Sequence, residues 1–587
     1  MKQNSISINN LNWKIAGEAG YGIKASGLMF AKACARGGLQ IFDYSEYPSL
    51  IRGGHNTYQV NVSEEEVFSP QSEVNLLVAL NQDTIDFHKD ELSNQAGVIY
   101  EQEDKKIEIT SLKKNNCQLF PVPLSRLAKE NGGKEIMRNS VALGASFALL
   151  NYDFKYLQSV IQDSFQKKGK EVIDLNVKIA EAGFNYVSQN FDVAKYPYQL
   201  KHLKSSPRMV LTGNEAIALG AIQAGCKFIS AYPMTPATPI LHYLASQQKN
   251  HNLIVKQTED EISAITMAIG ANYAGVRAMT CTSGGGFSLM VEGLGLAGMT
   301  ETPLVIAEVQ RPGPATGLPT WTEQADLRFL IHAAQGEFPR IIIAPGDVEE
   351  SFYATQSAFN LAEKYQLPVF ILSDKFLAES NKSQEFFDPK IIKIERGALL
   401  TNTQLQKMRK YRRYAFAKSG ISPRSIPGQK GGIFNANSDE HDQFGYSSED
   451  AENRARMMEK RLGKLDQVAL EIPDPILYGP AKADLTLIAW GSTKGPIIEA
   501  MKLFEKNRIR VNFLHVMYVY PFPAEKVKEV IRKAKKMVLI ENNATAQLGS
   551  LIREFTGIEI DRKLLKFSGR PFYPSEIYQY LTDNFKK

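Results

Sequence analysis

The sequence lacks long hydrophobic runs and any strong excess of one charge. No apolar segment reaches the ~18 residues of a membrane-spanning helix, and the polar stretch MKQNSISINN at the N-terminus is unlike a signal peptide. The 69 basic and 63 acidic side chains give a net charge of +6 without a long basic block, which argues against nucleic-acid or membrane-surface binding. We expect a cytoplasmic protein without nucleic-acid or membrane partners.

Cysteine is also scarce. Cys34, Cys117, Cys226 and Cys281 stand singly, and none forms the close pairs that zinc and iron–sulfur sites usually need. We therefore expect neither a metal site nor an iron–sulfur cluster on this chain.

The 587 residues are too many for one hydrophobic core, while 43% hydrophobic and 22% charged residues are ordinary for a globular protein. Alternating strand and helix patterns favour a multidomain α/β fold. The composition shifts predict a domain at 1–190, a linker at 191–207, a second domain at 208–380, an irregular connecting region at 381–480 and a third domain at 481–587.

One segment, 257–286, has a helix–strand–glycine pattern. Thr258 stands three residues before Glu261, a spacing that predicts a capping box at the start of a helix. Gly275 can end that helix in a left-handed conformation. A buried strand is expected from Arg277 to Thr282, and Gly284–Gly286 are expected to form a tight turn before a further apolar helix. This order is typical of parallel α/β architecture.

Two more motifs flank that segment. Residues 231–236 are AYPMTP, and residues 310–320 are QRPGPATGLPT. With the TCTSG stretch at 280–284, they resemble the α subunit of 2-oxoacid:ferredoxin oxidoreductases in its thiamine-pyrimidine-binding domain, with Met234 where that family usually has Ile. The resemblance extends to both ends: residues 1–190 resemble the family's γ domain, fused here ahead of the α domains, and residues 481–587 resemble a transketolase C-terminal domain.

The resemblance implies roles at the carboxyl ends of the predicted strands, where open parallel sheets carry their ligand sites. Glu261 is implied as the catalytic residue that hydrogen-bonds to the aminopyrimidine of thiamine diphosphate, and Tyr232 and Pro233 as further cofactor contacts. Thr235 is expected to orient the substrate, although it equally suits the cap of a helix that begins at Pro236.

Arg311 follows a predicted strand, Leu304–Val309. An arginine fork binds a carboxylate through two hydrogen bonds, and every 2-oxoacid has a carboxylate. We expect Arg311 to bind the substrate, with Thr316 and Thr320 lining the same pocket. The structural alternative is an ion pair between Arg311 and Glu308 or Glu323.

The N-terminal region has two candidate contacts for coenzyme A, both implied by the resemblance. Gly22 lies in a glycine turn between a strand and a helix, which suits a phosphate but equally serves tight packing. Arg52 lies in a loop, where it can bind an anion or remain solvated.

A further absence concerns the cofactor's diphosphate. Thiamine enzymes hold it through Mg²⁺ bound by a Gly-Asp-Gly motif, and no such triplet occurs here, since Val348 follows Gly346-Asp347. The resemblance therefore implies a β subunit that supplies Mg²⁺, the diphosphate site and a [4Fe-4S] cluster. The implied reaction is oxidative decarboxylation of a 2-oxoacid with coenzyme A and ferredoxin. Among the family's substrates we favour 2-oxoglutarate, and pyruvate and branched 2-oxoacids stay open. The alternatives are a ferredoxin-independent thiamine dehydrogenase component and a non-catalytic assembly subunit.

Overall fold

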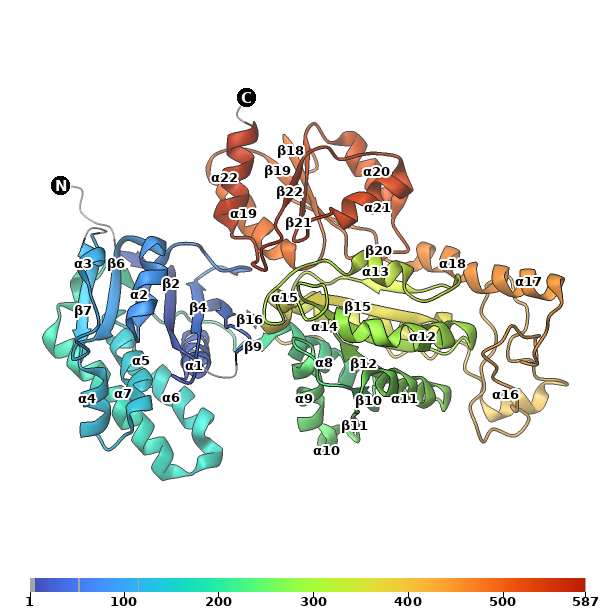
Figure 1. Ribbon diagram of the computed structural model, residues 1–587, viewed down its shortest axis with the longest axis horizontal. Coiled ribbons are helices and arrows are strands. Elements are labelled where there is room, and N and C mark those ends of the chain that lie inside the picture. Colours follow the sequence, from blue (N-terminus) through green and yellow to red (C-terminus); the bar gives the residue numbers. More distant parts are fainter. Residues whose placement is uncertain (1–5, 51–52, 114–115, 586–587) are drawn as a thin grey trace. The chain divides into compact units, whose positions relative to one another are not determined.

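The computed structural model describes residues 6–50, 53–113 and 116–585 (Figure 1). Its contacts divide the chain into two units. The first consists of Met1–Leu211, Ser380–Phe386 and Tyr573–Lys587, and the second of Thr212–Glu379 and Phe387–Phe572. The chain therefore passes between the units four times. Within the described ranges, no helix combines the length and the apolar character that a bilayer crossing requires.

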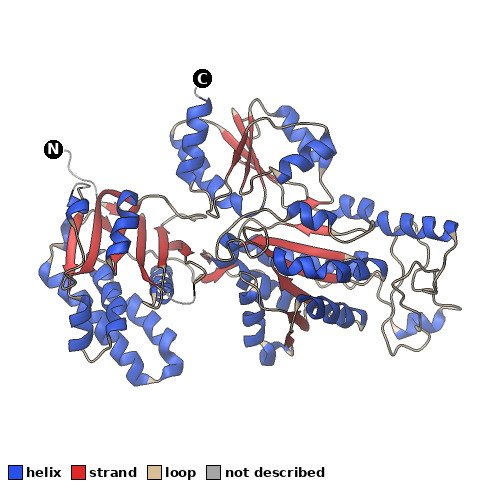
Figure 2. Ribbon diagram, in the orientation of Figure 1, coloured by secondary structure: helices blue, strands red, loops and turns tan. Residues whose placement is uncertain are grey.

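The first unit contains a mixed eight-stranded sheet covered by helices (Figure 2). Trp13 of its central strand β2 stacks on Phe30 of helix α1, with 4.2 Å between the ring centroids. Strands β5, β6 and β7 run parallel to β2, and β4 is antiparallel to it. The strand order is β7 (Gln118–Val122), β6 (Leu92–Glu101), β5 (Val74–Ala79), β2 (Leu11–Glu18), β4 (His55–Ser63), β3 (Gln40–Glu46), β16 (Asn381–Gln384) and β9 (Met209–Thr212).

Two helices of the first unit, α5 (Arg138–Leu149) and α7 (Lys170–Asn190), pack closely through glycines. A Cβ atom at Gly144 would collide with the carbonyl oxygen of Ala180, and one at Gly183 with that of Val141. The small residues of α5 are therefore needed for packing. The other elements of this unit are α1 (Ile23–Arg36), α2 (Gln82–His88), α3 (Thr110–Lys113), α4 (Leu124–Glu130), α6 (Phe154–Phe165), α22 (Pro574–Phe585), β1 (Ser7–Ile8) and β8 (Tyr198–Gln199).

The second unit begins with a seven-stranded sheet that has helices on both faces (Figure 2). All neighbouring strands are parallel except the pair formed by β14 and β20. The strand order is β11 (Ile254–Gln257), β10 (Phe228–Ala231), β12 (Ala278–Thr282), β13 (Leu304–Gln310), β15 (Pro368–Asp374), β14 (Ile341–Ile343) and β20 (Tyr518–Tyr520). The helices are α8 (Gly213–Gln223), α9 (Thr238–Ser246), α10 (Gln248–His251), α11 (Glu261–Tyr273), α12 (Gly284–Met299), α13 (Leu327–His332), α14 (Val348–Tyr365) and α15 (Lys375–Glu379).

The C-terminal part of the second unit forms a five-stranded sheet. Four of its strands, β19, β18, β21 and β22, are parallel, as the alternating strand and helix patterns predict. The strand order is β17 (Ile476–Tyr478), β19 (Val511–His515), β18 (Leu485–Ala489), β21 (Met537–Glu541) and β22 (Lys563–Leu565), with helices α19 (Lys494–Lys506), α20 (Ala524–Lys533) and α21 (Gln547–Thr556). The predicted multidomain α/β fold is confirmed.

In the chain, residues 387–475 lie after the first strands and helices of the second unit and before its C-terminal sheet. They form an extended arm with three helices, α16 (Asn402–Lys407), α17 (Ala451–Leu462) and α18 (Lys464–Glu471) (Figure 1). Within the arm His441 is fully buried, and its ring is tilted by 51° against that of Tyr414, with 4.1 Å between the ring centroids. Burial lowers the pKa of His441, so this side chain is a neutral part of the packing.

The expected boundaries differ from the observed units at two places. Strand β16 lies in the segment expected to be irregular, and it pairs with β3 through Lys382 and Phe42. The buried carboxylate of Asp43 fixes it by accepting a hydrogen bond from the backbone N–H of Asn381 at 2.7 Å. Helix α22 belongs to the first unit rather than to the C-terminal sheet. A four-residue strand that depends on distant partners has no local signal of its own.

Candidate functional site

The predicted motifs of the second unit meet at one edge of its parallel sheet. The YPMTP loop follows β10, the TSGGG stretch follows β12, and the arginine loop follows β13. Because these strands are parallel neighbours, their carboxyl ends lie side by side. Glu261 joins them from the start of α11, directly after the edge strand β11.

Glu261 is not the third residue of a capping box. Helix α11 begins at Glu261 itself, and the cap is Asp260, whose carboxylate accepts a hydrogen bond from the backbone N–H of Ser263 at 2.8 Å. The hydroxyl of Thr258 instead donates to the carbonyl of Asp260. The predicted cap is therefore wrong by two residues. The carboxylate of Glu261 therefore takes no part in a capping box.

The carboxyl group of Glu261 is buried, with 3% of the residue exposed, and its Oε1 has no hydrogen-bond partner among the described residues. A Cβ at Gly286 would lie 2.5 Å from this oxygen and would also collide with Oγ1 of Thr282. The absence of a side chain at Gly286 therefore leaves room for the carboxylate of Glu261. Burial raises the pKa of Glu261, so its proton is held more tightly than in water.

The three glycines belong to a helix rather than to a turn. Gly284–Gly286 form the first turn of α12, and Ser283 is its N-cap without a side-chain cap. The hydroxyl of Ser283 is buried and has no hydrogen-bond partner in the described ranges. Orphan donors and acceptors in a buried position are costly unless a ligand satisfies them. Ser283 and Glu261 are therefore consistent with a polar ligand at this edge.

Thr235 and Arg311 are brought together as predicted by their places at the strand ends. Nη1 of Arg311 donates to the backbone carbonyl of Thr235 at 2.7 Å. Neither expected ion pair forms, since no carboxylate of the described residues lies within ion-pair distance of Arg311. Helix α9 begins at Thr238, so Thr235 does not cap it. The remaining donors of the Arg311 fork stay available.

A group of acidic side chains behind Arg311 has no signal in the sequence. Glu308 is fully buried, and burial together with Asp326 raises its pKa well above the usual range. Burial also raises the pKa of Asp326 to about 6 and that of Glu323 to about 7. Asp326 lies at the amino end of α12, where a Cβ on Gly284 would be 2.5 Å from its carboxylate. Burial lowers the pKa of Arg311, and the nearby carboxyl groups of Asp326 and Glu308 oppose that shift.

The other predicted contacts lie on loops. Tyr232 is exposed, and Pro233 is half-buried. Thr316 is exposed, whereas Thr320 is buried and its hydroxyl lacks a partner within the described ranges. Thr320 is thus better placed than Thr316 for a ligand inside the site.

The first unit contains the two candidates for coenzyme A. Arg52 lies outside the described residues. Gly22 is the N-cap of α1 with φ 75°, and a Cβ there would collide with the amide of Asn139. Packing alone therefore requires a glycine at this position.

The candidate site fits one half of thiamine diphosphate. The buried, unpaired carboxylate of Glu261 suits a ring nitrogen that shares a proton. A diphosphate–Mg²⁺ site is not found at Asp347, whose carboxylate caps α14 and pairs with Nζ of Lys494 at 2.6 Å. Within the described residues, no three His, Cys, Asp or Glu side chains are grouped to hold a metal ion.

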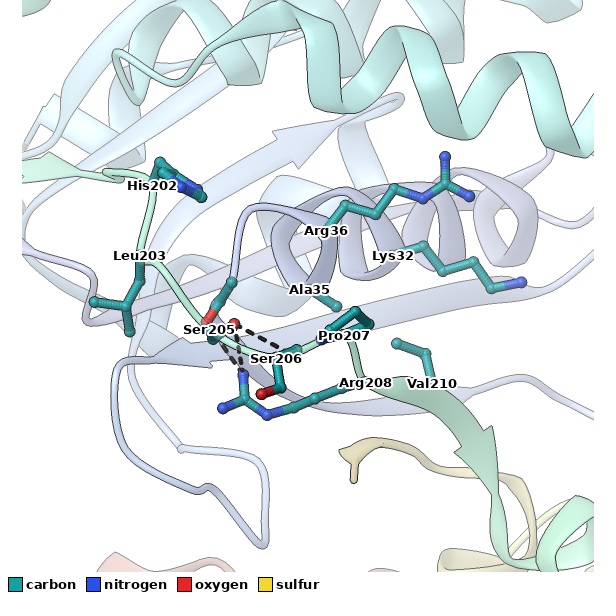
Figure 3. A pocket seen from close by; sticks show the side chains of 11 residues that line it. Lys32, Ala35, Arg36, His202, Leu203, Ser205, Ser206, Pro207, Arg208 and Val210 are labelled. Carbon is teal, nitrogen blue, oxygen red and sulfur yellow. Dashed lines mark hydrogen bonds between the residues drawn. The ribbon is translucent and has the colours of Figure 1, made fainter. Parts of the chain in front are cut away.

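A hollow of about 400 Å³ in the first unit lies beside the end of α1 (Figure 3). Its basic side chains already bind parts of the chain. Arg36 pairs with Asp163, His202 contacts the carbonyl of Gly37 at 3.0 Å, and Arg208 donates to the carbonyl of Gly38. These contacts stabilise the C-terminus of a helix.

Comparisons with known proteins match the chain in three successive parts. Residues 12–186 match the model for pyruvate ferredoxin/flavodoxin oxidoreductase, residues 219–460 that for pyruvate flavodoxin/ferredoxin oxidoreductase, thiamine diP-binding, and residues 483–571 that for pyruvate:ferredoxin oxidoreductase core domain II.

Whole-length relatives agree with these matches. The chain is 35% identical to a 2-oxoacid:ferredoxin oxidoreductase subunit alpha from a Sulfolobus species, over 97% of this chain and 96% of the relative. It is 29% identical to the 2-oxoglutarate oxidoreductase subunit KorA of Mycobacterium tuberculosis, over 98% and 91%. A solved structure of 2-oxoglutarate:ferredoxin oxidoreductase from Magnetococcus marinus, with 2-oxoglutarate, coenzyme A and succinyl-CoA bound, matches at TM-score 0.91 and 33% identity, over 98% and 99%.

Proposed function

We propose, because this chain belongs to the family of 2-oxoacid:ferredoxin oxidoreductase α subunits, that it is the γα-fused subunit of an enzyme that oxidatively decarboxylates a 2-oxoacid with coenzyme A. The products are an acyl-CoA, CO₂ and reduced ferredoxin. We propose 2-oxoglutarate as the favoured substrate, since two of the similar proteins carry it in their names. The enzyme works in the cytoplasm.

The buried, unpaired carboxylate of Glu261 is the observation that carries this proposal. Thiamine diphosphate, when bound, supplies the nucleophilic carbon that adds to the 2-oxo carbon. Glu261 holds the proton that its Oε1 shares with the pyrimidine ring nitrogen. The raised pKa of this carboxyl brings it nearer to that of a weakly basic ring nitrogen, which favours such sharing.

Arg311 and Thr235 bind and orient the substrate in this proposal. The free donors of Arg311 hold the carboxylate of the 2-oxoacid, and its bond to the carbonyl of Thr235 fixes the direction of the fork. Asp326 and Glu308 oppose the fall in the pKa of Arg311 that burial causes. A fixed fork lowers the entropy that the substrate loses when it is positioned. Thr320 contributes its hydroxyl to the same pocket, with Thr316 at its entrance.

A β subunit completes the site. Helix α11 carries Glu261, and helix α12 begins with Gly284–Gly286. Both helices expose large apolar side chains: Ile262 is 55%, Met267 40% and Leu289 52% exposed. Such side chains are typical of a surface that a partner covers. The partner provides Mg²⁺, the diphosphate site and a [4Fe-4S] cluster, and ferredoxin accepts the electrons. Tyr232 and Pro233 contact the cofactor from this side.

Coenzyme A is assigned to the first unit. Arg52 binds one of its phosphates, and Gly22 lies in the turn that follows β2, where the chain enters α1. This assignment rests on the resemblance of residues 1–190 to the family's γ domain.

The experiment that tests the function is coexpression of this chain with a β subunit of the same enzyme family. The purified complex is assayed for 2-oxoacid-dependent reduction of viologen, with and without coenzyme A. 2-Oxoglutarate is compared with pyruvate and a branched 2-oxoacid. We expect coenzyme A-dependent turnover with the highest kcat/KM for 2-oxoglutarate. Another order of substrates would overturn the favoured substrate only, and the absence of turnover with every 2-oxoacid would overturn the function.

A further inference from the structure

Five cationic side chains of the second unit are almost completely buried where the arm meets the C-terminal ends of α11 and α12. Four of them share two carboxylates. Glu363 pairs with Arg277 at 3.3 Å and Arg424 at 3.1 Å, and Glu301 pairs with Lys460 at 2.5 Å and Lys464 at 2.6 Å. The fifth cation, Arg413, makes no ion pair within the described ranges; it donates to the side chain of Gln366 and to the carbonyl of Glu301.

The charges of this group do not balance. The C-termini of α11 and α12 contribute roughly one further negative charge. Arg424 contacts the end of α11, because it donates to the carbonyl of Asn272 at 3.2 Å. The group still carries a positive excess. Burying an unbalanced charge is costly unless a group loses its proton or a counter-ion enters. The pKa of Lys464, which burial lowers to about 7, reflects the same excess.

A small cavity lies between the two arginines of the arm. Arg413 and Arg424 line it, and it measures about 10 Å³, room for one water-sized particle. Nε of Arg424 is buried and has no hydrogen-bond partner among the described residues. The residue is 4% exposed. The pKa of Arg424 is lowered to about 10, chiefly by burial; Glu363 opposes this shift, and repulsion from Arg413 and Arg396 adds to it.

The serine and threonine hydroxyl groups of the cavity are already engaged. Ser425 donates to the carbonyl of Gly432 at 2.7 Å, and Thr300 donates to that of Leu296 at 2.8 Å. Thr302 lies 2.9 Å from the hydroxyl of Thr300. The charged residues of the lining are Arg413 and Arg424, and Tyr273, Pro303 and Phe434 complete it. A water molecule also needs acceptors for its two protons, whereas a monatomic anion needs donors only.

We propose that this cavity binds a monatomic inorganic anion, chloride under cellular conditions, between Arg413 and Arg424. The anion offsets the buried positive charge and satisfies Nε of Arg424. It stabilises the contact between the arm and the C-terminal ends of α11 and α12. The opposite ends of these two helices carry Glu261 and Gly284–Gly286. The inference is independent of the reaction assigned to the enzyme.

The test uses the full chain together with its β subunit. Thermal unfolding is followed in sodium chloride, sodium bromide and sodium gluconate at equal ionic strength, because gluconate is too large for the cavity. We expect a saturable rise of about 1–3 °C in Tm with chloride or bromide relative to gluconate. Crystals soaked in bromide should show an anomalous peak between Arg413 and Arg424.

Arg424→Gln should abolish the halide-specific rise in Tm. Arg396→Gln is the matched control, because Arg396 also pairs with Glu363 but does not line the cavity. It should keep the rise. Equal melting in all three salts and no bromide peak would mean that the cavity holds water and would overturn the proposal. A rise that persists in Arg424→Gln would place the halide elsewhere and overturn it equally. If Arg424→Gln does not fold, the bromide peak in the parent protein decides.

Discussion

The carboxylate of Glu261 can be separated from its structural surroundings by one substitution. Glutamine keeps the shape of the side chain but cannot share a proton with a ring nitrogen. Because Asp260 caps the helix, Glu261→Gln removes no cap. We expect turnover of 2-oxoacid with viologen to fall by about 10² or more, the scale of lost acid–base assistance. Assembly with the β subunit should be unchanged. Turnover like that of the parent would contradict the assigned role.

The difference in stability between Glu261→Gln and the parent should depend on pH in a defined direction. Burial raises the pKa of Glu261 in the folded chain above its unfolded value. The folded state therefore binds the proton more tightly, and its stability falls as pH rises above the unfolded pKa. Glutamine has no such titration. In the isolated chain, the Tm of Glu261→Gln relative to the parent should be higher at pH 8 than at pH 4.5, as measured by calorimetry. An equal difference at both values would indicate an ordinary, solvated carboxylate.

Arg311 can be tested by replacing the fork with a point charge. Arg311→Lys keeps the cation but loses the planar donors that reach the carbonyl of Thr235 and a carboxylate together. We expect kcat/KM to fall at least about tenfold, the equivalent of roughly 1.4 kcal/mol for a lost charged hydrogen bond. Far-UV dichroism and Tm provide the control for folding. Unaltered kinetics with several 2-oxoacids would return Arg311 to a structural role.

At this scale the sequence predicted the places of Thr235, Glu261 and Arg311, because each follows a strand with a recognisable motif. It did not predict their surroundings. Glu308 precedes Arg311 by three residues, whereas Asp326 comes from a later segment, and only the folded chain brings their carboxyl groups together. The cap was misplaced because Thr258 and Asp260 both suit an N-cap, and backbone geometry decides between them.

At the scale of elements, the start of α11 gives a direct test of the corrected cap. Asp260→Ala removes the acceptor for the N–H of Ser263 and should lower the stability of the second unit by about 1 kcal/mol. Thr258→Ala should cost less, because its hydroxyl donates to one loop carbonyl only. Urea unfolding of both variants measures the difference. A larger loss in Thr258→Ala would restore the capping box.

Helix α12 provides a test of the partner surface. Leu289 is 52% exposed in this chain, so Leu289→Asp should leave its Tm nearly unchanged. A charge buried in a partner interface is costly, and we expect binding of the β subunit to weaken at least about tenfold. Analytical ultracentrifugation or titration calorimetry measures this. Leu470→Asp is a control on the arm, because Leu470 is also exposed. Equal loss in both variants would argue against α12 as the interface.

The succession of elements was largely predictable because helices and strands alternate with clear periods. The strand predicted from Arg277 to Thr282 corresponds to β12 (Ala278–Thr282), and the one predicted from Leu304 to Val309 corresponds to β13 (Leu304–Gln310), each within one residue of its observed ends. Strand β16 and helix α22 were missed as parts of the first unit. Their partners lie hundreds of residues away in the sequence, and their own segments specify only short local structure.

At the scale of the whole molecule, the division of the cofactor site predicts dependence on a partner. The isolated chain should bind thiamine diphosphate weakly or not at all, because Asp347 is engaged by Lys494 and the diphosphate half is assigned to the β subunit. Binding should become Mg²⁺-dependent and stoichiometric only after coexpression, with the brown colour of an iron–sulfur cluster. Titration calorimetry on both preparations distinguishes the cases. Stoichiometric Mg²⁺-dependent binding by the isolated chain would contradict the assignment.

Strand β16 and helix α22 belong to the first unit but are synthesised long after its other elements. This order determines when the first unit can complete its folding on the ribosome. When residue 211 leaves the exit tunnel, β3 still has an open edge, because β16 is made some 170 residues later. The last helix of the same unit appears only at the end of synthesis. An unpaired edge strand is prone to wrong pairing. The nascent chain must therefore carry an unfinished first unit through the synthesis of almost the whole second one, and a truncated fragment 1–211 would remain in that unfinished state.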